Sequence, residues 1–274
     1  ESKTPIMLMS IPRMAYAYLS AKVKSQVTVP VIASVRINDL KLAEEILDNE
    51  QTDMVSIGRP LIVDPELPNK YNKGQLDDIR MCIACNQGCF DSLLNFKPVS
   101  CTYNAMVGHE GEYKITKAGK SKKIVVVGGG PGGMEAARVL ALRGHNVTLY
   151  EKSNQLGGQL RYAFIPPGRE EIQNIISYLE RQISKLKVNI KMGKEADLQT
   201  LEEEHPDAVI VATGGRPIML NLPGIKGENV YIASSVLEGK VTTGKDVVII
   251  GGGTVGCEVA LYVAKQGAMR PDVA

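Results

Sequence analysis

Residues 122–151, KKIVVVGGGPGGMEAARVLALRGHNVTLYE, decide the fold that the sequence predicts. The apolar run at 124–127 has the length and β-branched composition of a strand, and it leads into a cluster of glycines. Gly128, Gly130 and Gly133 give the pattern G-x-G-x-x-G. The first glycine permits a tight turn, the second lets the backbone approach a pyrophosphate, and the third lets the next helix pack on the strand. The stretch predicts a Rossmann-like α/β unit that binds a dinucleotide.

An acid stands at the end of the second strand of this unit. Glu151 lies 18 residues after Gly133, where a carboxylate accepts hydrogen bonds from ribose hydroxyls. Gly132 extends the glycine loop, and the N–H groups at the start of the helix would face the phosphates. The alternative, that the glycines only shape a turn, is less favoured because strand, glycines, helix, strand and acid follow in order within about 30 residues.

The pattern returns 123 residues later, in KDVVIIGGGTVGCEVALYVAKQGA at 245–268. Gly251, Gly253 and Gly256 repeat the three glycines after another apolar run. The repeat predicts a second nucleotide-binding module, here for NAD(P)H. Cys257 lies just inside the expected helix, and we expect it to be a small buried residue, with a redox role as the less favoured alternative.

The second module does not continue as the first does. When the two are superimposed in sequence, RPDV at 270–273 falls opposite the strand at 147–150, and Ala274 falls opposite Glu151. Proline cannot donate a hydrogen bond to a central ladder. We therefore expect an incomplete module without the residue that would choose between NADH and NADPH.

A shorter strand–helix–strand pattern precedes both modules. Apolar runs at 29–34 and 52–58 flank a helical stretch at 37–49, with short connections between them. This order predicts a pair of parallel strands.

Four of the five cysteines lie between these regions. Cys82, Cys85, Cys89 and Cys101 have the spacing C-x2-C-x3-C-x11-C. Four thiolates suit either zinc or an iron–sulfur cluster. Structural zinc sites with four cysteines usually use two CxxC pairs, whereas one CxxC occurs here, so the spacing favours iron–sulfur. Zinc remains open, and a disulfide framework is a third alternative.

Composition narrows the remaining classes of function. The 274 residues are 44% hydrophobic and carry a formal net charge of +2, which gives no electrostatic argument for a nucleic-acid partner. We see no apolar run long enough to span a membrane and no signal peptide. A reducing, cytoplasmic compartment fits best, and there clustered cysteines more often bind metals than form disulfides.

The order of these motifs resembles the iron–sulfur flavoenzymes related to old yellow enzyme, which include 2,4-dienoyl-CoA reductase, 2-enoate reductase and trimethylamine dehydrogenase. The resemblance rests on PVIASVRINDLKLAEEIL with DMVSIGRPLIVDPELPNK, on RMCIACNQGC, and on the flavin-domain motifs LGGQL and VATGG. It implies four segments. These are the last units of a TIM-type FMN barrel at 1–78, an iron–sulfur segment at 79–120, an FAD domain at 121–240 and the start of an NAD(P)H domain at 241–274.

The resemblance also assigns residues to cofactors. Arg36, Gly58 and Arg59 would hold the FMN phosphate, as loops after the last barrel strands commonly do; surface salt bridges are the alternative for the two arginines. Val35 stands where the family pattern has a glycine. The four cysteines would hold a 4Fe–4S cluster. The FAD residues would be Gly128, Gly130, Gly132, Gly133, Glu151, Gly158, Gln159, Thr213 and Gly214.

The implied activity is NAD(P)H-dependent reduction of activated C=C bonds in an enoate or an enoyl-CoA, with electrons passing from NAD(P)H to FAD, the cluster and FMN. Two alternatives remain: an amine dehydrogenase or demethylase of the same family, and a non-catalytic zinc-bound electron-transfer or scaffold piece. No catalytic residue is assigned, because the family's proton donor lies on earlier barrel strands. His109, His145 and His205 are expected to be surface residues.

The chain is expected to begin near the sixth barrel strand and to end inside the NAD(P)H domain. Such a piece would leave strand edges and apolar faces bare. We therefore expect it to be ordered only beside further barrel sequence or an oligomeric partner.

Overall fold

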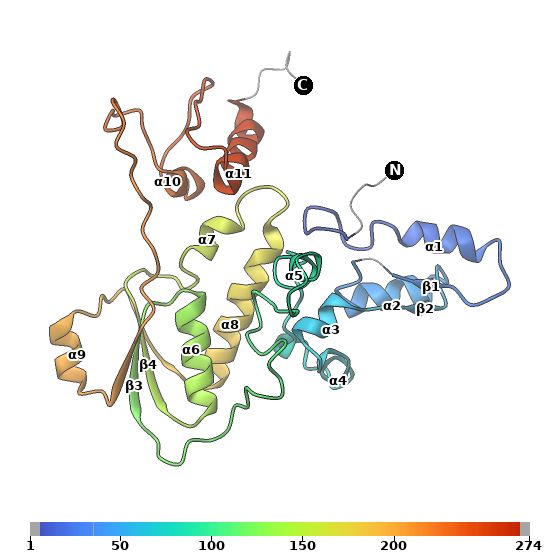
Figure 1. Cartoon of the computed structure of the whole chain (residues 1–274), viewed down its shortest axis with the longest axis horizontal. Helices are drawn as coiled ribbons and strands as arrows, with labels where there is room; N and C mark the ends of the chain where they lie inside the picture. Colours follow the sequence, from blue (N-terminus) through green and yellow to red (C-terminus); the bar gives the residue numbers. More distant parts are fainter. Residues whose placement is uncertain (1–5, 35, 269–274) are drawn as a thin grey trace. The chain divides into compact units, whose positions relative to one another are not determined.

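The computed structural model describes residues 6–34 and 36–268. Val35 and residues 270–274, on which the expectation of an incomplete second module rests, therefore lie outside the described residues. The chain divides into two compact units. Unit 1 comprises Glu1–Lys120, Ala141–Gly144 and Ser177–Lys187, and unit 2 comprises Ser121–Leu140, His145–Ile176 and Val188–Ala274. Figure 1 labels their helices and strands.

Unit 1 contains the predicted parallel strand pair. Strands β1 (Ile32–Ala33) and β2 (Met54–Val55) pair in parallel around helix α2 (Leu40–Asp48). Asp39 caps this helix by accepting a hydrogen bond from the Lys41 N–H, as favoured at an N-cap. Both strands are shorter than predicted because each has one neighbour in a two-stranded sheet. The unit also contains α1 (Ala17–Lys24), α3 (Arg59–Val63), α4 (Leu67–Asn72), the 3₁₀ turn η1 (Leu76–Asp78) and α5 (Phe90–Leu94).

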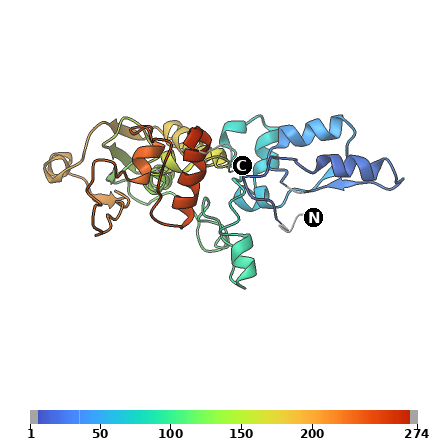
Figure 2. The same ribbon diagram turned by 90° about the horizontal axis from the view of Figure 1, so that it is seen from above.

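The apolar side chains of unit 1 are unevenly covered. Ala33, Ile37, Ala43 and Ile46 form a buried cluster between the strand pair and α2. By contrast, Figure 2 shows α5 projecting from the other helices of its unit, and the adjoining Phe96 is 99% exposed.

Unit 2 contains the predicted Rossmann-like α/β unit. Its parallel strands β3 (Lys123–Val127), β4 (Asn146–Glu151), β5 (Asn189–Met192) and β6 (Ala208–Val211) have the order β5-β4-β3-β6. Helix α6 (Pro131–Leu142) joins β3 to β4 on one face of the sheet, and α9 (Leu198–Glu204) lies on the other (Figure 1). The centre of this sheet is dry, because Val125, Val126 and Leu149 are fully buried.

Between β4 and β5 the chain forms α7 (Leu160–Ala163), the turn η2 (Glu170–Ile172) and α8 (Gln173–Lys185). The helix predicted at about 169–186 is thus confirmed as η2 followed by α8. Helix α8 begins in unit 2 and continues into unit 1.

The second nucleotide-binding module lacks the strand that the sequence predicts before its glycines. Residues 246–250 form no strand, since none of the described strands pairs with them, and Val248 and Ile250 are exposed. Helix α11 (Thr254–Val263) does form, and the turn that follows it, η3 (Ala264–Ala268), contains a kink at Gly267, whose φ is 102°.

Cys257 corrects a second expectation, because it is exposed rather than buried. Val259 and Val263, one turn apart on α11, pack against Leu237 of α10 (Ala233–Leu237). Cys257 precedes Val259 by two positions, which at 3.6 residues per turn places it on the opposite side of the helix.

Candidate functional site

The first glycine loop of unit 2 leaves no room for side chains. Gly128 has φ +112°, and a β-carbon on it would lie 2.3 Å from the carbonyl oxygen of Ala212. A β-carbon on Gly133 would lie 1.8 Å from the carbonyl oxygen of Gly128. The turn and the close helix–strand approach, which the glycine pattern predicted, are therefore properties of this backbone.

Glu151 is tied to the same loop. Its carboxylate is buried and accepts hydrogen bonds from the Gly129 N–H at 2.7 Å and from the Ser153 N–H at 2.8 Å. The sequence analysis assigned Glu151 to a ribose and did not predict its hydrogen bond from the Gly129 N–H. The available signal was that Gly129 is the central residue of the GGG run. Glu151 fixes the shape of the glycine loop.

The two later motifs meet at this loop. Gly158, with φ +51°, lies so close that a β-carbon on it would be 3.0 Å from the Gly130 Cα. The Gln159 side chain donates a hydrogen bond of 2.8 Å to the Gly215 carbonyl, which joins LGGQL to VATGG. One broad cleft in unit 2 is lined by most of the predicted FAD residues: Gly128, Gly130, Gly132, Glu151, Gly158, Gln159, Thr213 and Gly214.

The second glycine loop repeats the geometry of the first. Gly251 has φ +117°, and a β-carbon on Gly256 would lie 1.9 Å from the Gly251 carbonyl oxygen. Gly253 is the N-cap of α11. The sequence repeat is therefore also a repeat of turn geometry, which suits a second dinucleotide.

In unit 1, one cavity brings the four clustered cysteines together. We call it the thiol cavity; its lining includes Arg59, Asn86, Tyr103, Cys82, Cys85, Cys89 and Cys101. The loop reaches this shape through Ala84 and Asn86, which adopt positive φ values of 50° and 63°. Strained backbone of this kind gathers at functional sites.

Two stretches of the cysteine segment, at Gly88 and at Ser100, also approach each other closely. A β-carbon on Gly88 would lie 2.8 Å from the Ser100 carbonyl oxygen, and the Ser100 N–H donates to the Gly88 carbonyl at 2.8 Å. This glycine brings Cys89 and Cys101 to the same cavity although 11 residues separate them.

The thiols are held in a partly dry, hydrogen-bonding environment. Burial raises the pKa of Cys82 to about 11, opposed by the Ala84 N–H and by the charge of Arg59. Burial likewise raises the pKa of Cys101, opposed by the N–H groups of Tyr103 and Asn104. A metal centre that binds these sulfurs would have to displace their protons.

The four thiols that line this cavity are the donor set of an iron–sulfur cluster. Cys82, Cys85, Cys89 and Cys101 all line this one cavity. Yet the described residues contain no group of three or more His, Cys, Asp or Glu side chains arranged for one metal ion. Thiolates are the usual ligands of iron–sulfur clusters. The described cysteines form no disulfide.

The two predicted phosphate-binding arginines are both held by the segment that precedes α1. Arg36 is buried, with φ +55°, and donates to the Met9 carbonyl at 2.9 Å. Arg59 donates to the Met7 carbonyl at 2.8 Å, and Gly58 is the N-cap of α3. Neither arginine has the exposed position that a surface salt bridge would give, and their role toward FMN stays a prediction.

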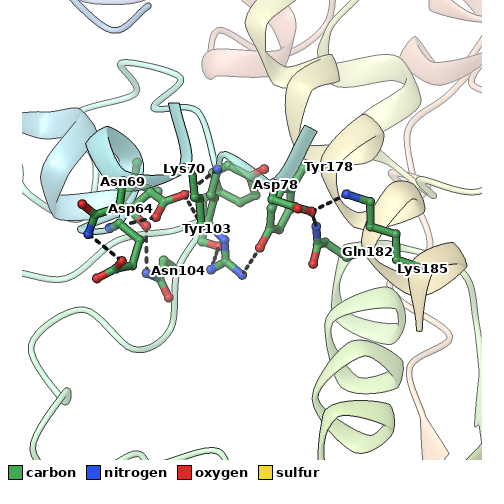
Figure 3. A network of polar contacts seen from close by, with 12 residues as sticks. Asp64, Asn69, Lys70, Asp78, Tyr103, Asn104, Tyr178, Gln182 and Lys185 are labelled. Carbon is green, nitrogen blue, oxygen red and sulfur yellow. Dashed lines mark hydrogen bonds and ion pairs between the residues drawn. The ribbon is translucent and has the colours of Figure 1, made fainter. Parts of the chain in front are cut away.

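Sequence reasoning missed a cation held between two aromatic rings. The Arg80 guanidinium carbon lies 5.3 Å from the ring centre of Tyr103 and 4.9 Å from that of Tyr178, and the rings meet edge to face. Figure 3 shows Tyr103 and Tyr178 in this network beside Asp64, which accepts from the Arg80 N–H at 2.8 Å. No local pattern marks this contact, because Tyr178 lies 98 residues after Arg80.

A parallel α/β sheet with a glycine-lined cleft, a second glycine loop and a thiol cavity define a class of flavin- and nicotinamide-dependent oxidoreductases. The chain belongs to the pyridine nucleotide-disulphide oxidoreductase family, whose model matches residues 122–273. Residues 10–78 match the NADH:flavin oxidoreductase / NADH oxidase family. Together the two families imply FAD or FMN with NAD(P)H.

Individual relatives agree with this assignment. A metal reductase of Desulforamulus reducens is 43% identical over 98% of this chain and 41% of the relative. A cinnamate reductase of Clostridium sporogenes is 41% identical over 89% of this chain and 36% of the relative. The solved structure of a 2-naphthoyl-CoA reductase complex has a TM-score of 0.92 and 36% identity, covering 96% of this chain and 40% of that one. The resemblance to the old yellow enzyme-related flavoenzymes is confirmed.

The chain spans about 40% of the length of these relatives. None of the helices among the described residues has the length and apolarity needed to cross a bilayer.

Proposed function

We propose that the protein containing this chain is an NAD(P)H-dependent reductase of activated C=C bonds. The observation that carries the proposal is the gathering of four cysteines at one cavity in a chain that also holds two dinucleotide-type glycine loops. When bound, the flavins transfer electron pairs and an iron–sulfur cluster transfers single electrons.

Each part of the chain has a role in this proposal. Cys82, Cys85, Cys89 and Cys101 supply the thiolates of the cluster site. The glycine loop that starts at Gly128 supplies N–H groups and a close backbone approach for the FAD pyrophosphate. Glu151 holds that loop through Gly129 and leaves its remaining lone pairs for ribose hydroxyls. The loop that starts at Gly251 supplies N–H groups and a close backbone approach for the pyrophosphate of NAD(P)H.

The proposed substrates are unsaturated acids or their acyl-CoA thioesters. The names of two relatives, cinnamate reductase and 2-naphthoyl-CoA reductase, support this class. Amine dehydrogenases are also relatives, but more distant ones. We therefore favour electron flow from NAD(P)H toward the substrate rather than from an amine.

An anaerobic assay of the protein that contains this chain tests the direction of electron flow. We expect NADH or NADPH to bleach the flavin absorbance and cinnamate or an enoyl-CoA to restore it, while dimethylglycine leaves oxidised flavin unchanged. Bleaching by the amine, with no response to NADH or NADPH, would overturn the proposal in favour of an amine dehydrogenase.

The proposal also covers the cellular location of the protein and its assembly. A cytoplasmic location is supported by the gathering of four cysteines at one cavity, since clustered cysteines in a reducing compartment more often bind metals than form disulfides. An oligomeric partner or further barrel sequence is supported by the two-stranded sheet of β1 and β2, whose Ile32 and Met54 are exposed. Cell fractionation and light scattering of the purified protein test these two points.

A further inference from the structure

Arg59 occupies a place that its predicted role toward FMN does not explain. It begins α3 directly after Gly58, and its side chain lines the thiol cavity together with Cys82, Cys85, Cys89 and Cys101. The position of Arg59 at the start of α3 thus brings its guanidinium to the wall of the thiol cavity.

The Arg59 side chain is held by hydrogen bonds that leave its charge uncompensated. Its Nη1 donates to the Met7 carbonyl at 2.8 Å and to the Asn86 Oδ1 at 2.5 Å. Both acceptors are neutral oxygens, so neither cancels the positive charge. Asn86 belongs to the loop between Cys85 and Cys89, so the same contact also anchors the cysteine loop to α3.

The lining of the cavity contains little other charge. Among its described lining residues, Arg59 is the one whose side chain is cationic at neutral pH; the rest are apolar, amide, hydroxyl or thiol groups. A cation near four thiolates is strongly favourable in such an environment, because Coulomb energies grow as the local dielectric constant falls.

We propose that Arg59 is a positioning and charge-compensating residue of the iron–sulfur site. It stabilises the anionic thiolates and favours the cluster state that carries one additional electron. The inference rests on the proposed function, since it requires the four cysteines to bind a cluster. It goes beyond the phosphate contact predicted for Gly58 and Arg59, because it concerns the cluster rather than FMN.

The test compares Arg59→Met, which removes the charge, with Arg59→Lys, which keeps it. Arg181→Met serves as a control, because this arginine of unit 1 is 42% exposed and pairs with the exposed Asp77. Each variant of the protein that contains this chain is purified anaerobically and assayed for iron, sulfide and FMN. A dithionite titration followed by electron paramagnetic resonance then gives the midpoint potential of the cluster.

We expect Arg59→Met to shift the ratio of oxidised to reduced cluster at least tenfold toward the oxidised form, about 59 mV for a one-electron couple. Arg59→Lys should stay near the wild type, and Arg181→Met should match it. If Arg59→Met fails to retain iron, retention by Arg59→Lys supports the charge role, whereas loss of iron from both overturns it.

A wild-type potential in iron-replete Arg59→Met also overturns the inference, whatever happens to FMN. Wild-type protein without iron and sulfide is a separate outcome, because it contradicts the proposed function before any variant is compared.

Discussion

Gly133 packs against Gly128 so closely that a single added methyl group has no space, since its carbon would lie 1.8 Å from the Gly128 carbonyl oxygen. A β-carbon added to the adjacent Gly132 would have no heavy atom within 4 Å. Two neighbouring glycines of one helix are thus constrained very differently, which provides a matched pair of substitutions.

We expect Gly133→Ala to destabilise unit 2, because overpacking of this kind costs about 1–3 kcal/mol or more. Gly132→Ala should leave the free energy of unfolding unchanged or raise it by up to about 1 kcal/mol, the helix preference for alanine over glycine. Urea unfolding measures both. A Gly133→Ala variant as stable as the Gly132→Ala variant would contradict the packing described here.

Glu151 should govern the affinity for FAD through the shape of the glycine loop. In Glu151→Gln, an amide N–H group faces either the Gly129 or the Ser153 N–H, so one buried hydrogen bond is lost, at a cost of about 1–3 kcal/mol. The dissociation constant for FAD, measured by fluorescence quenching, is expected to rise about tenfold or more. The exposed Glu202→Gln is the control, and an unchanged FAD affinity in Glu151→Gln would refute this role.

The cation held by Tyr103 and Tyr178 should contribute to the stability of unit 1. Tyr178→Leu removes an aromatic face from the buried Arg80 and should lower the free energy of unfolding by about 2 kcal/mol, the upper range for a desolvated cation–π contact. Tyr178→Phe keeps the ring and loses one long hydrogen bond of 3.4 Å, so its effect should be smaller. Equal losses in the two variants would show that the hydroxyl, not the ring, is the source of stability.

Glu204 should make the stability of unit 2 sensitive to acid. Hydrogen bonds from Lys123 and Tyr150 hold its pKa below the ordinary value for a glutamate. The folded state therefore favours ionised Glu204, and this stability is present above the unfolded-state pKa of about 4.3 and is lost as pH falls through the lower folded-state value. We expect the free energy of unfolding to fall less steeply below about pH 4 in Glu204→Gln than in the wild type. Glu203→Gln, at an exposed position, should follow the wild type, and parallel curves for all three proteins would exclude the linkage.

Local patterns were sufficient to predict some parts of this molecule. The helices at 37–49 and after Gly128 were predictable because capping residues, apolar spacing and glycines all lie within one short stretch. The gathering of the cysteines was predictable for the same reason, since at most 11 residues separate neighbouring members.

Contacts between distant parts of the chain were not predictable in this way. The lengths of β1 and β2 depend on which strands are available to pair, which an apolar run does not encode. The contact between Arg80 and Tyr178 joins residues 98 positions apart with no periodic signal. Arg59 meets Asn86 because the cysteine loop adopts positive φ values, a backbone choice that the residue types alone did not indicate.

The central claim is that four sulfurs at the thiol cavity hold one iron–sulfur cluster. Metal and acid-labile sulfide analysis of anaerobically purified protein that contains this chain, compared with its Cys101→Ser variant, tests it most directly. The account predicts brown protein with about four iron and four sulfide per chain, the content of one 4Fe–4S cluster, and a marked loss of both in the variant. Colourless protein with one zinc per chain and no iron would contradict it.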